Sequence, residues 1–316
     1  MRVLVTGAAG FIGSRFVSAL LEDRVQGAEG AHVTGLDALT YAGDLRRLPA
    51  KHPRLSFVRG DIADPEHMAE VVPEHDAVVN FAAESHVDRS IAASDAFVRT
   101  NVLGTQVLLE AARRAAVDRF LQVSTDEVYG SIGSGAWDET TPLAPNSPYS
   151  ASKAGAELLV RAFHRTHGMD VSITRCCNNY GPAQHPEKLI PRFTTTLMRG
   201  GKVPLYGDGL HTREWLHVDD HCRAIGLVLM NGSAGRDYNI GGEESTNLDI
   251  TMRLLGLLGL PESAIEYVAD RQGHDRRYSV DDGRIREEFG YAPEVSLEDG
   301  LIDTVDWYSE NLPFWE

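Results

Sequence analysis

The feature that most constrains the fold is a glycine-rich turn directly behind the first apolar run. Residues 3–5 are Val-Leu-Val, Gly7, Gly10 and Gly13 follow with the spacing G-x-x-G-x-x-G, and residues 14–22 have a helical pattern. Glycine permits a sharp turn, a close approach of backbone to a pyrophosphate and tight helix packing, and the helix amino terminus then faces the anion. The strand–turn–helix order predicts a dinucleotide-binding unit in which these three glycines contact the cofactor.

A carboxylate follows the second predicted strand, residues 32–36. Asp37 lies 24 residues after Gly13, close to the roughly 20-residue spacing of the ribose-binding acid in dinucleotide folds. A carboxylate there accepts hydrogen bonds from the ribose hydroxyls and repels a 2′-phosphate, which favours NAD over NADP. After the third strand, Asp61 is a candidate for the adenine amino group, with Ile62 packed on the ring. An equally open interpretation is that Asp61 only forms a turn and does not contact the cofactor.

Apolar runs alternate with helical patterns over the first half of the chain. Further predicted strands are residues 55–59, 77–81, 120–123 and 171–175, and predicted helices are residues 95–115 and 149–167. This alternation with short connections implies parallel βαβ units. We expect an α/β fold, a Rossmann-like doubly wound parallel sheet with a smaller C-terminal substrate-binding α/β domain.

The alternation ends near residue 176, which predicts a division of the chain. We expect residues 1–175 to form the NAD-binding Rossmann domain, with a strand and a helix returning from about 210–240. Residues 176–316 then form mainly the substrate-binding domain. Within that part, the pattern of residues 203–209 predicts a hairpin-like segment.

Two adjacent carboxylates follow the fifth predicted strand. Asp126 and Glu127 come directly after Ser124 and Thr125 at its carboxyl end. Burying two such groups is costly unless the protein uses them, and ligands bind at this end of the strands in open parallel sheets. We therefore expect Asp126 and Glu127 to serve as an acid and a base.

A tyrosine and a lysine begin the predicted helix at residue 149. Tyr149 and Lys153 are four residues apart and share one helix face. Tyrosine has an ordinary pKa of about 10, and a neighbouring ammonium favours the phenolate, so we expect Lys153 to lower the pKa of Tyr149. With Ser124 or Thr125 completing the hydrogen-bond network, this set suits hydride chemistry at a secondary alcohol.

The charge balance restricts the partners of the chain. A formal net charge of −16 argues against general binding of nucleic acid or of a membrane surface, because both are polyanionic. The three cysteines are a poor disulfide framework, and we see no spacing typical of metal ligands. The first residues read as a strand and no apolar run approaches a membrane span of about 20 residues. We expect a reduced, cytoplasmic protein without a metal.

One local cationic cluster stands out in this acidic sequence. Residues 270–277 read Asp-Arg-Gln-Gly-His-Asp-Arg-Arg. The guanidinium group of arginine donates two parallel hydrogen bonds to a diphosphate. A ligand-binding segment is the interpretation we favour, and a solvated loop is the alternative.

The motifs together resemble the dTDP-glucose 4,6-dehydratases, a family within the extended short-chain dehydrogenase/reductases, over essentially the whole chain. The residues that carry the resemblance are 6–14, 37–43, 82–90, 124–130, 149–153, 178–182, 188–191 and 270–274. The Asp-Glu pair after Thr125 separates the dehydratases from the related sugar-nucleotide 4-epimerases. Departures are Gln272, where many relatives have proline, and the pair Cys176 and Cys177.

The resemblance implies a set of contacts with NAD and with a sugar nucleotide, dTDP-glucose. The implied NAD contacts are Phe11, Ile12, Asp37, Ala38, Leu39, Thr40, Asp61, Ile62, Phe81, Ala82, Ala83, Thr100, Tyr149, Lys153 and Asn179. The implied substrate contacts are Ser85, Thr125, Asn178, Lys188, Leu189, Pro204, Leu205, Tyr206, Arg213, Asn247, Asp270, Arg271, Gly273 and His274. It also implies a homodimer formed through residues 93–115 and 149–167.

The expected reaction has three stages. NAD+ takes hydride from carbon 4 of the glucose while Tyr149, aided by Lys153 and Thr125, takes the hydroxyl proton. Glu127 then removes the carbon 5 proton and Asp126 protonates the leaving carbon 6 hydroxyl, before hydride returns to carbon 6. The alternatives are a sugar-nucleotide 4-epimerase and a non-catalytic NAD-sensing or scaffold protein, although proteins of the second kind commonly lack the Tyr-x-x-x-Lys set.

Overall fold

The centre of the molecule is a seven-stranded parallel sheet. The computed structural model describes residues 1–270 and 274–315. The strand order is β10-β6-β5-β4-β1-β2-β3, and all neighbours are parallel. The bounds are β1 (Arg2–Thr6), β2 (His32–Asp37), β3 (Leu55–Arg59), β4 (Ala77–Asn80), β5 (Arg119–Thr125), β6 (Val171–Cys176) and β10 (Arg236–Ile240). The order reverses beside β1, so the expected doubly wound sheet is confirmed.

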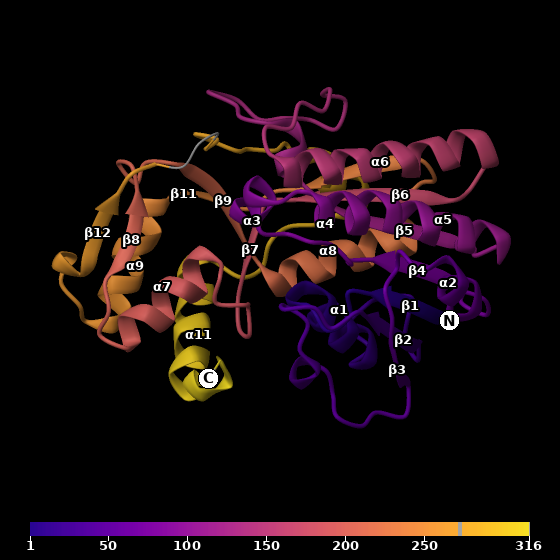
Figure 1. The fold of residues 1–316 in the computed structure, drawn as a ribbon, viewed down its shortest axis with the longest axis horizontal. Helices are drawn as coiled ribbons and strands as arrows, with labels where there is room; N and C mark the ends of the chain where they lie inside the picture. Colours follow the sequence, from indigo (N-terminus) through magenta and orange to yellow (C-terminus); the bar gives the residue numbers. More distant parts are fainter. Residues whose placement is uncertain (271–273, 316) are drawn as a thin grey trace.

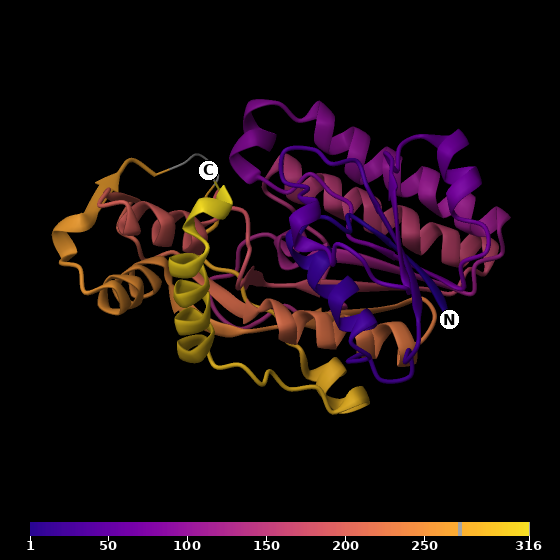
Figure 2. The same ribbon diagram turned by 90° about the horizontal axis from the view of Figure 1, so that it is seen from below.

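Helices cover both faces of this sheet, as Figures 1 and 2 show. On one face, α1 (Phe11–Leu21) packs against α8 (Val218–Asn231). On the other face lie α2 (Pro65–Val71), α5 (Thr105–Arg114) and α6 (Pro148–His167). Because both faces are covered, the inner strands are apolar runs rather than alternating patterns; all four residues of β4 are buried.

Helix α6 carries the Tyr149–Lys153 pair and has strong signals at both ends. Ser147 and Ser150 form a capping box at its start, and Pro148 occupies the first turn. Gly168 ends the helix with a left-handed φ of +67°. These signals fix where the helix begins relative to β5, and therefore where Tyr149 lies.

The helix expected over residues 95–115 has three parts. After α3 (Val87–Ala92), the chain forms α4 (Asp95–Phe97), a π-helical stretch (Val98–Gly104) and α5. Gly104 allows this stretch to lie close to Ile62, because an added Cβ would be 2.7 Å from the Ile62 side chain. Sequence periodicity identified the helix and missed the π-helical turn.

A smaller α/β part forms beyond the carboxyl ends of the main strands. Its three-stranded sheet has the order β11-β9-β7, and a separate pair joins β8 to β12. The strands are β7 (Asn178–Tyr180), β8 (Val203–Tyr206), β9 (Thr212–His217), β11 (Glu243–Thr246) and β12 (Ile265–Val268). Helices α7 (Leu189–Met198), α9 (Asn247–Leu258) and α11 (Leu297–Glu310) share its apolar core, and α10 (Gly283–Phe289) packs on β10. Short 3₁₀ turns cover Leu45–Arg47, Asp126–Tyr129, Glu262–Ala264 and Leu312–Trp315.

The hairpin-like interpretation of residues 203–209 was wrong. Strand β8 pairs in parallel with β12, with Val203 opposite Ile265. A parallel pair needs a crossover connection, which is supplied here by the chain between the two strands. A local apolar run followed by glycines does not reveal a partner so distant in the sequence.

The chain returns to the main sheet late. Strand β10 lies beside β6 and α8 packs on α1, whereas β9 belongs to the smaller sheet. The division into residues 1–175 and 176–316 stays a prediction. In the described residues, we find no helix with the length and apolar character to span a membrane.

Candidate active site

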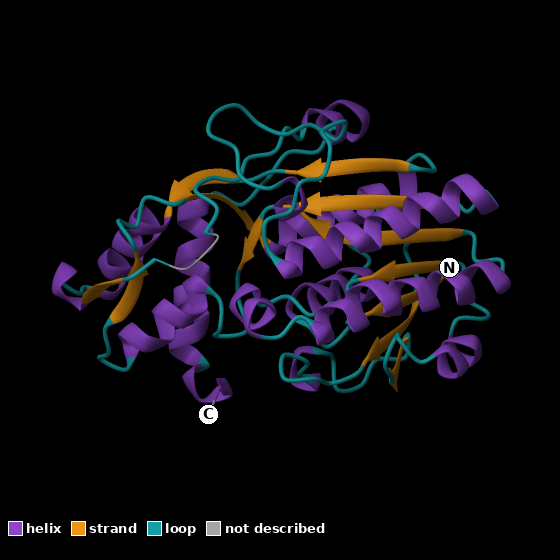
Figure 3. Cartoon of the chain, turned by 45° about the horizontal axis from the view of Figure 1, so that its top comes forward, coloured by secondary structure: helices purple, strands orange, loops and turns teal. Residues whose placement is uncertain are grey.

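A cleft lies between the carboxyl ends of the main strands and the smaller part. Figure 3 shows arrowheads of the main sheet pointing toward that part. Two adjoining cavities of about 310 and 180 Å³ occupy the cleft. Both are lined by Glu127, Asn178 and Lys188, so they form one continuous site. The site therefore has room for one group in each cavity, side by side.

The larger cavity contains the glycine turn. Gly7 has a left-handed φ of +66°, and an added Cβ would lie 2.7 Å from the backbone nitrogen of Ala82. At Gly13 an added Cβ would lie 2.2 Å from the Gly7 carbonyl oxygen. A side chain at either position would clash with backbone. The turn therefore leaves the start of α1 accessible as a cradle for a phosphate group.

Ten of the predicted cofactor contacts line this cavity. They are Gly7, Gly10, Phe11, Ile12, Gly13, Phe81, Ala83, Tyr149, Lys153 and Asn179. The residues outside its lining are Asp37, Ala38, Leu39, Thr40, Asp61, Ile62, Ala82 and Thr100. The amide of Asn179 is held internally, because its oxygen bonds the His221 ring at 2.7 Å.

Asp37 and Asp61 both organise backbone. The Asp37 carboxylate accepts from the amides of Ala9 at 2.9 Å and Leu39 at 2.8 Å, beside the glycine turn. Burial raises the pKa of Asp37, and these two amides oppose the rise. Asp61 accepts from the Ala63 amide at 2.9 Å, so it does make the turn that the alternative interpretation describes.

The two acids after β5 have different environments. Asp126 is 2% exposed, its Oδ1 accepts from the Thr125 hydroxyl at 3.2 Å, and its Oδ2 has no hydrogen-bond partner among the described residues. Burial raises the pKa of Asp126 well above its usual range, and the charges of Glu127 and Glu214 add to the rise. Glu127 is only partly buried and lines both cavities. The surroundings of Asp126 therefore favour its protonated form, beside a second carboxyl group that reaches the cleft.

Tyr149 and Lys153 lie in the same cavity, but the expected effect on the tyrosine is not found. Burial raises the pKa of Tyr149, the Glu127 charge adds to the rise, and a hydrogen bond with Thr125 opposes it. The Lys153 ammonium donates to the Val123 carbonyl at 2.7 Å, and burial lowers the pKa of Lys153 to about 8. Desolvation therefore outweighs the expected lowering of the tyrosine pKa by the lysine charge.

The smaller cavity contains most of the predicted substrate contacts. Its lining includes Asn178, Lys188, Leu189, Pro204, Leu205, Tyr206, Arg213, Asn247 and His274. Ser85 and Thr125 line the larger cavity instead, and Lys188 donates to the Ser85 carbonyl at 2.8 Å. Asp270 lies outside the lining and is hydrogen-bonded to the His274 ring at 2.7 Å. Arg271 and Gly273 lie outside the described residues.

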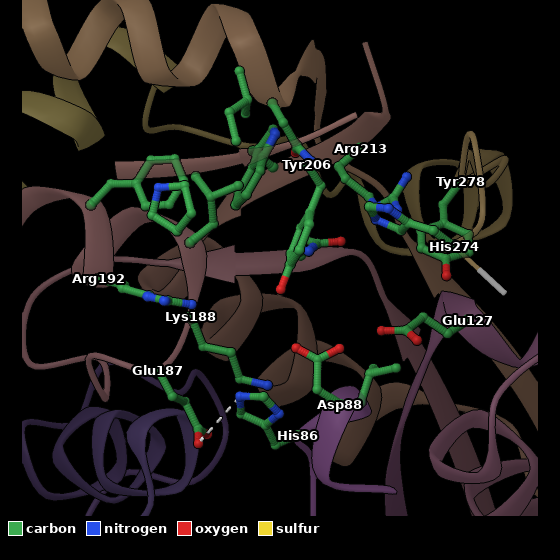
Figure 4. Close-up of a pocket in the computed structure, with 18 residues that line it drawn as sticks. His86, Asp88, Glu127, Glu187, Lys188, Arg192, Tyr206, Arg213, His274 and Tyr278 are labelled. Carbon is green, nitrogen blue, oxygen red and sulfur yellow. Dashed lines mark ion pairs between the residues drawn. The ribbon is translucent and has the colours of Figure 1, made fainter. Parts of the chain in front are cut away.

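A buried guanidinium forms one wall of this cavity. Arg213 is 4% exposed, donates to the Asp275 carbonyl at 2.8 Å and lies 4.3 Å above the Tyr278 ring. Figure 4 shows Arg213 with His274 and Tyr278 on one side, while the Glu127 and Asp88 carboxyl groups point into the space from another. A positive wall facing acids suits a ligand with a diphosphate at one end and hydroxyl groups at the other.

Eight of the residues that line the smaller cavity were not identified from the sequence. They are His86, Val87, Asp88, Glu187, Arg192, Phe193, Trp215 and Tyr278. Arg192 lies four residues after Lys188 at the start of α7, so helical spacing was a usable signal for it. His86 and Asp88 follow Ser85 directly. Tyr278 carries no local signal, because it reaches the cavity through tertiary packing.

Fold and site together define the class of nucleotide-sugar epimerases and dehydratases. A sequence model of the family described as "GDP-mannose 4,6 dehydratase" matches residues 4–304. The chain belongs to this family.

Particular relatives cover the whole chain. It is 56% identical to a dTDP-glucose 4,6-dehydratase of Streptomyces niveus, over 100% of this chain and 95% of the relative. The crystal structure of DesIV, a dTDP-glucose 4,6-dehydratase from Streptomyces venezuelae with NAD and TYD bound, has a TM-score of 0.99 and 59% identity, covering 100% of this chain and 99% of the other. A UDP-glucose 4-epimerase from Thermotoga maritima has a TM-score of 0.91 at 32% identity, covering 99% and 100%.

Proposed function

We propose that the chain is an NAD-dependent dTDP-glucose 4,6-dehydratase, a hydro-lyase of deoxysugar biosynthesis. It converts dTDP-glucose to dTDP-4-keto-6-deoxyglucose and water. The observation that carries the proposal is the buried Asp126, whose pKa burial raises, beside Glu127 in the cleft that also contains Tyr149. Full-length relatives with this name support it.

The cofactor cavity fits NAD. Side chains at Gly7 and Gly13 would clash with the backbone of the tight turn that precedes α1, and Asp37 places a carboxyl group beside this turn. When bound, NAD+ accepts a hydride from carbon 4 of the sugar and returns it to carbon 6. The residues that would hold it are the ten that line the cavity, with Asp37 at the edge of the glycine turn.

The alcohol chemistry falls to Tyr149, Thr125 and Lys153. Tyr149 takes the proton of the carbon 4 hydroxyl, and Thr125 holds the phenol through the hydrogen bond between them. The pKa of Tyr149 is raised, so the phenol must lose its proton to become a base. A cationic neighbour favours that loss, and Lys153 retains its charge below a pH of about 8.

The elimination falls to the acid pair. Glu127 removes the carbon 5 proton, which the carbon 4 ketone has made acidic. Asp126 gives its proton to the carbon 6 hydroxyl, which leaves as water, and carbon 5 regains a proton when hydride has returned to carbon 6. Proton transfer of this kind contributes about 10²–10⁴ in rate for each group. Two neighbouring carboxyl groups can divide these tasks when only one is ionised.

The strongest competitor is a 4-epimerase, because the Thermotoga structure has nearly the same fold. An epimerase has no need for the acid pair at Asp126 and Glu127, since it retains the carbon 6 hydroxyl. A non-catalytic NAD-binding protein would need neither this pair nor the complete Tyr149 and Lys153 set, and all four residues line the larger cavity.

Product mass separates these functions. The purified chain is incubated separately with dTDP-glucose and UDP-glucose, and the products are weighed by mass spectrometry. We expect dTDP-glucose to lose one water. A product of unchanged mass but inverted configuration would indicate an epimerase, and the absence of any reaction with intact protein would indicate the non-catalytic alternative.

We also propose a cytoplasmic homodimer. Val98, Leu103 and Leu158 are 54%, 44% and 58% exposed and lie on the segments expected to pair, residues 93–115 and 149–167. Exposed apolar side chains on neighbouring helices favour a protein interface. Sedimentation analysis should give twice the chain mass, and Leu158→Glu should shift it to the monomer. Cell fractionation tests the location.

A further inference from the structure

A second cluster of ionisable side chains lies at the edge of the smaller cavity, apart from the proton-transfer groups. His211 is in the connection from β8 to β9, and Asp270 and His274 follow β12. One ligand atom from each of the three lies within 4.8 Å of the others. Because the two parts of the cluster are far apart in the sequence, residue spacing did not reveal it. We propose that His211, Asp270 and His274 form a binding site for a divalent cation of the Zn²⁺ type.

The contacts within the cluster already resemble a coordination shell. His211 Nε2 lies 3.2 Å from Asp270 Oδ2, and His274 Nδ1 lies 2.7 Å from Asp270 Oδ1. Ligands around a tetrahedral Zn²⁺, with bonds of about 2.0–2.2 Å, are roughly 3.3 Å apart. Small side-chain rotations therefore convert the hydrogen-bonded cluster into a three-ligand site. Two imidazoles and one carboxylate favour Zn²⁺ and Co²⁺ over Mg²⁺ or Ca²⁺.

The surroundings of His211 also suit a metal ligand. Its side chain is buried, with 3% exposed. Its Nδ1 is buried without a hydrogen-bond partner among the described residues. The nearby Arg276 is paired with Asp208 at 2.7 and 2.9 Å, which reduces its repulsion of a cation.

The two histidine rings of the cluster lie against each other. They stack with centroids 3.8 Å apart, and a ring nitrogen of each lies against the Asp270 carboxylate. A single ion can therefore contact one nitrogen of each ring and one carboxylate oxygen.

A bound cation would connect two segments of the smaller part. His274 lines the cavity beside Arg213 and Tyr278, as Figure 4 shows, whereas His211 and Asp270 lie outside its lining. The ion would hold His274 against the β8–β9 connection and fix this wall of the cavity. The effect on a sugar nucleotide rests on the proposed function, but the binding of the ion does not.

Cobalt titration tests the site directly. Intact chain freed of metal with a chelator is titrated with Co²⁺ and followed by visible absorption, and Zn²⁺ is then added as a competitor. We expect one Co²⁺ per chain, displaced by Zn²⁺. His211→Gln and Asp270→Asn should each weaken binding by about tenfold or more. The matched controls are His32→Gln, at an exposed histidine, and Asp306→Asn, at an exposed aspartate of α11 away from the cluster; both should bind as the unmodified chain does.

Two results would overturn the site. One is equal Co²⁺ affinity in the unmodified chain and in folded His211→Gln, and the other is no saturable Co²⁺ absorption at all. If circular dichroism shows that a variant is unfolded, X-ray absorption of the Zn²⁺-loaded unmodified chain decides the question. Two imidazole ligands support the site, and fewer contradict it. None of these readouts depends on turnover, so failure of the proposed activity is measured separately.

Discussion

Two groups of buried charges on neighbouring strands behave in opposite ways. Arg175 on β6 is fully buried, but it bonds the Glu157 carboxylate at 2.6 Å and the Asp237 carboxylate at 3.0 Å. At the end of β5, the Asp126 and Glu127 carboxyl groups lie together, and Asp126 has a buried oxygen with no partner among the described residues. In the first group, the positive charge of Arg175 is balanced by the two carboxylates. In the second group, the negative charges are balanced only when a proton or a ligand binds.

The arginine network and the acid pair differ in charge balance although they lie close together. Ser124 is opposite Arg175 in the β5–β6 register, two positions before Asp126. The buried arginine network is therefore a structural element, whereas burial and the charges of Glu127 and Glu214 raise the pKa of Asp126. Burial by itself does not distinguish structure from function here; the presence of a paired charge does.

The largest expected effect concerns activity. Glu127→Gln and Asp126→Asn should each lower the rate of water loss by about 10²–10⁴, since neither amide can exchange the required proton. Both variants should still reduce bound NAD+ with dTDP-glucose, which is measured by absorbance. Normal turnover in either variant would contradict the assigned role.

The same change at Asp126 should not weaken the fold. Asp126→Asn removes a buried carboxyl group whose ionisation the fold opposes, so the free energy of unfolding should be unchanged or higher in urea titrations. This result separates the acid pair from the arginine network. A large loss of stability would mean that Asp126 is also a structural residue.

Breaking the arginine network should have the opposite pattern. Glu157→Gln leaves Arg175 with a weaker set of partners in a fully buried position, and losing one member of such a pair costs about 3–5 kcal/mol. Urea unfolding at pH 7 measures this loss. Asp126→Asn is the matched control, because both changes replace a buried carboxyl group by an amide. A loss below about 1 kcal/mol would contradict the comparison.

A third buried carboxyl group gives a pH test. Burial raises the pKa of Glu214 to about 7, against hydrogen bonds from Ser279 and Val280. Between the ordinary value of about 4.5 and about 7, the folded chain keeps a proton that the unfolded chain has lost. Stability should therefore fall as the pH rises through this window, by up to about 1.4 kcal/mol per pH unit. Glu214→Gln should flatten the slope in urea titrations; an unchanged slope would refute the assignment.

The smallest effect is expected at an exposed pair. On α5, Arg113 lies 2.9 Å from Glu110, and both side chains are more than a quarter exposed. Glu110→Gln should change the free energy of unfolding by less than about 0.5 kcal/mol, since water screens such pairs. A loss comparable to that of Glu157→Gln would remove the distinction between paired charges that are buried and those that are exposed.

Local sequence signals predicted the main sheet well. The runs that became β1 and β4 are largely apolar and buried because both faces of the sheet are covered, and the glycine turn identified the cofactor end. Asp126, Glu127, Tyr149 and Lys153 were found because strand ends and helix spacing bring them together. Each of these signals lies within a few residues of the element that it predicts.

Other features depend on contacts that no local pattern records. The pairing of β8 with β12 joins Val203 to Ile265, and the metal cluster joins His211 to His274. The direction of the Tyr149 pKa shift was also missed, because burial outweighs a charge four residues away. Such outcomes depend on the packed structure as a whole.

The late return of β10 sets an order for assembly on the ribosome. The β6 edge stays open until residues 236–240 have been synthesised, and Arg175 lacks its Asp237 partner until then. A chain stopped near residue 200 therefore presents an unpaired parallel edge together with an incompletely neutralised buried cation. Such an edge promotes aggregation. Most of the chain must leave the exit tunnel before the nucleotide-binding sheet can close.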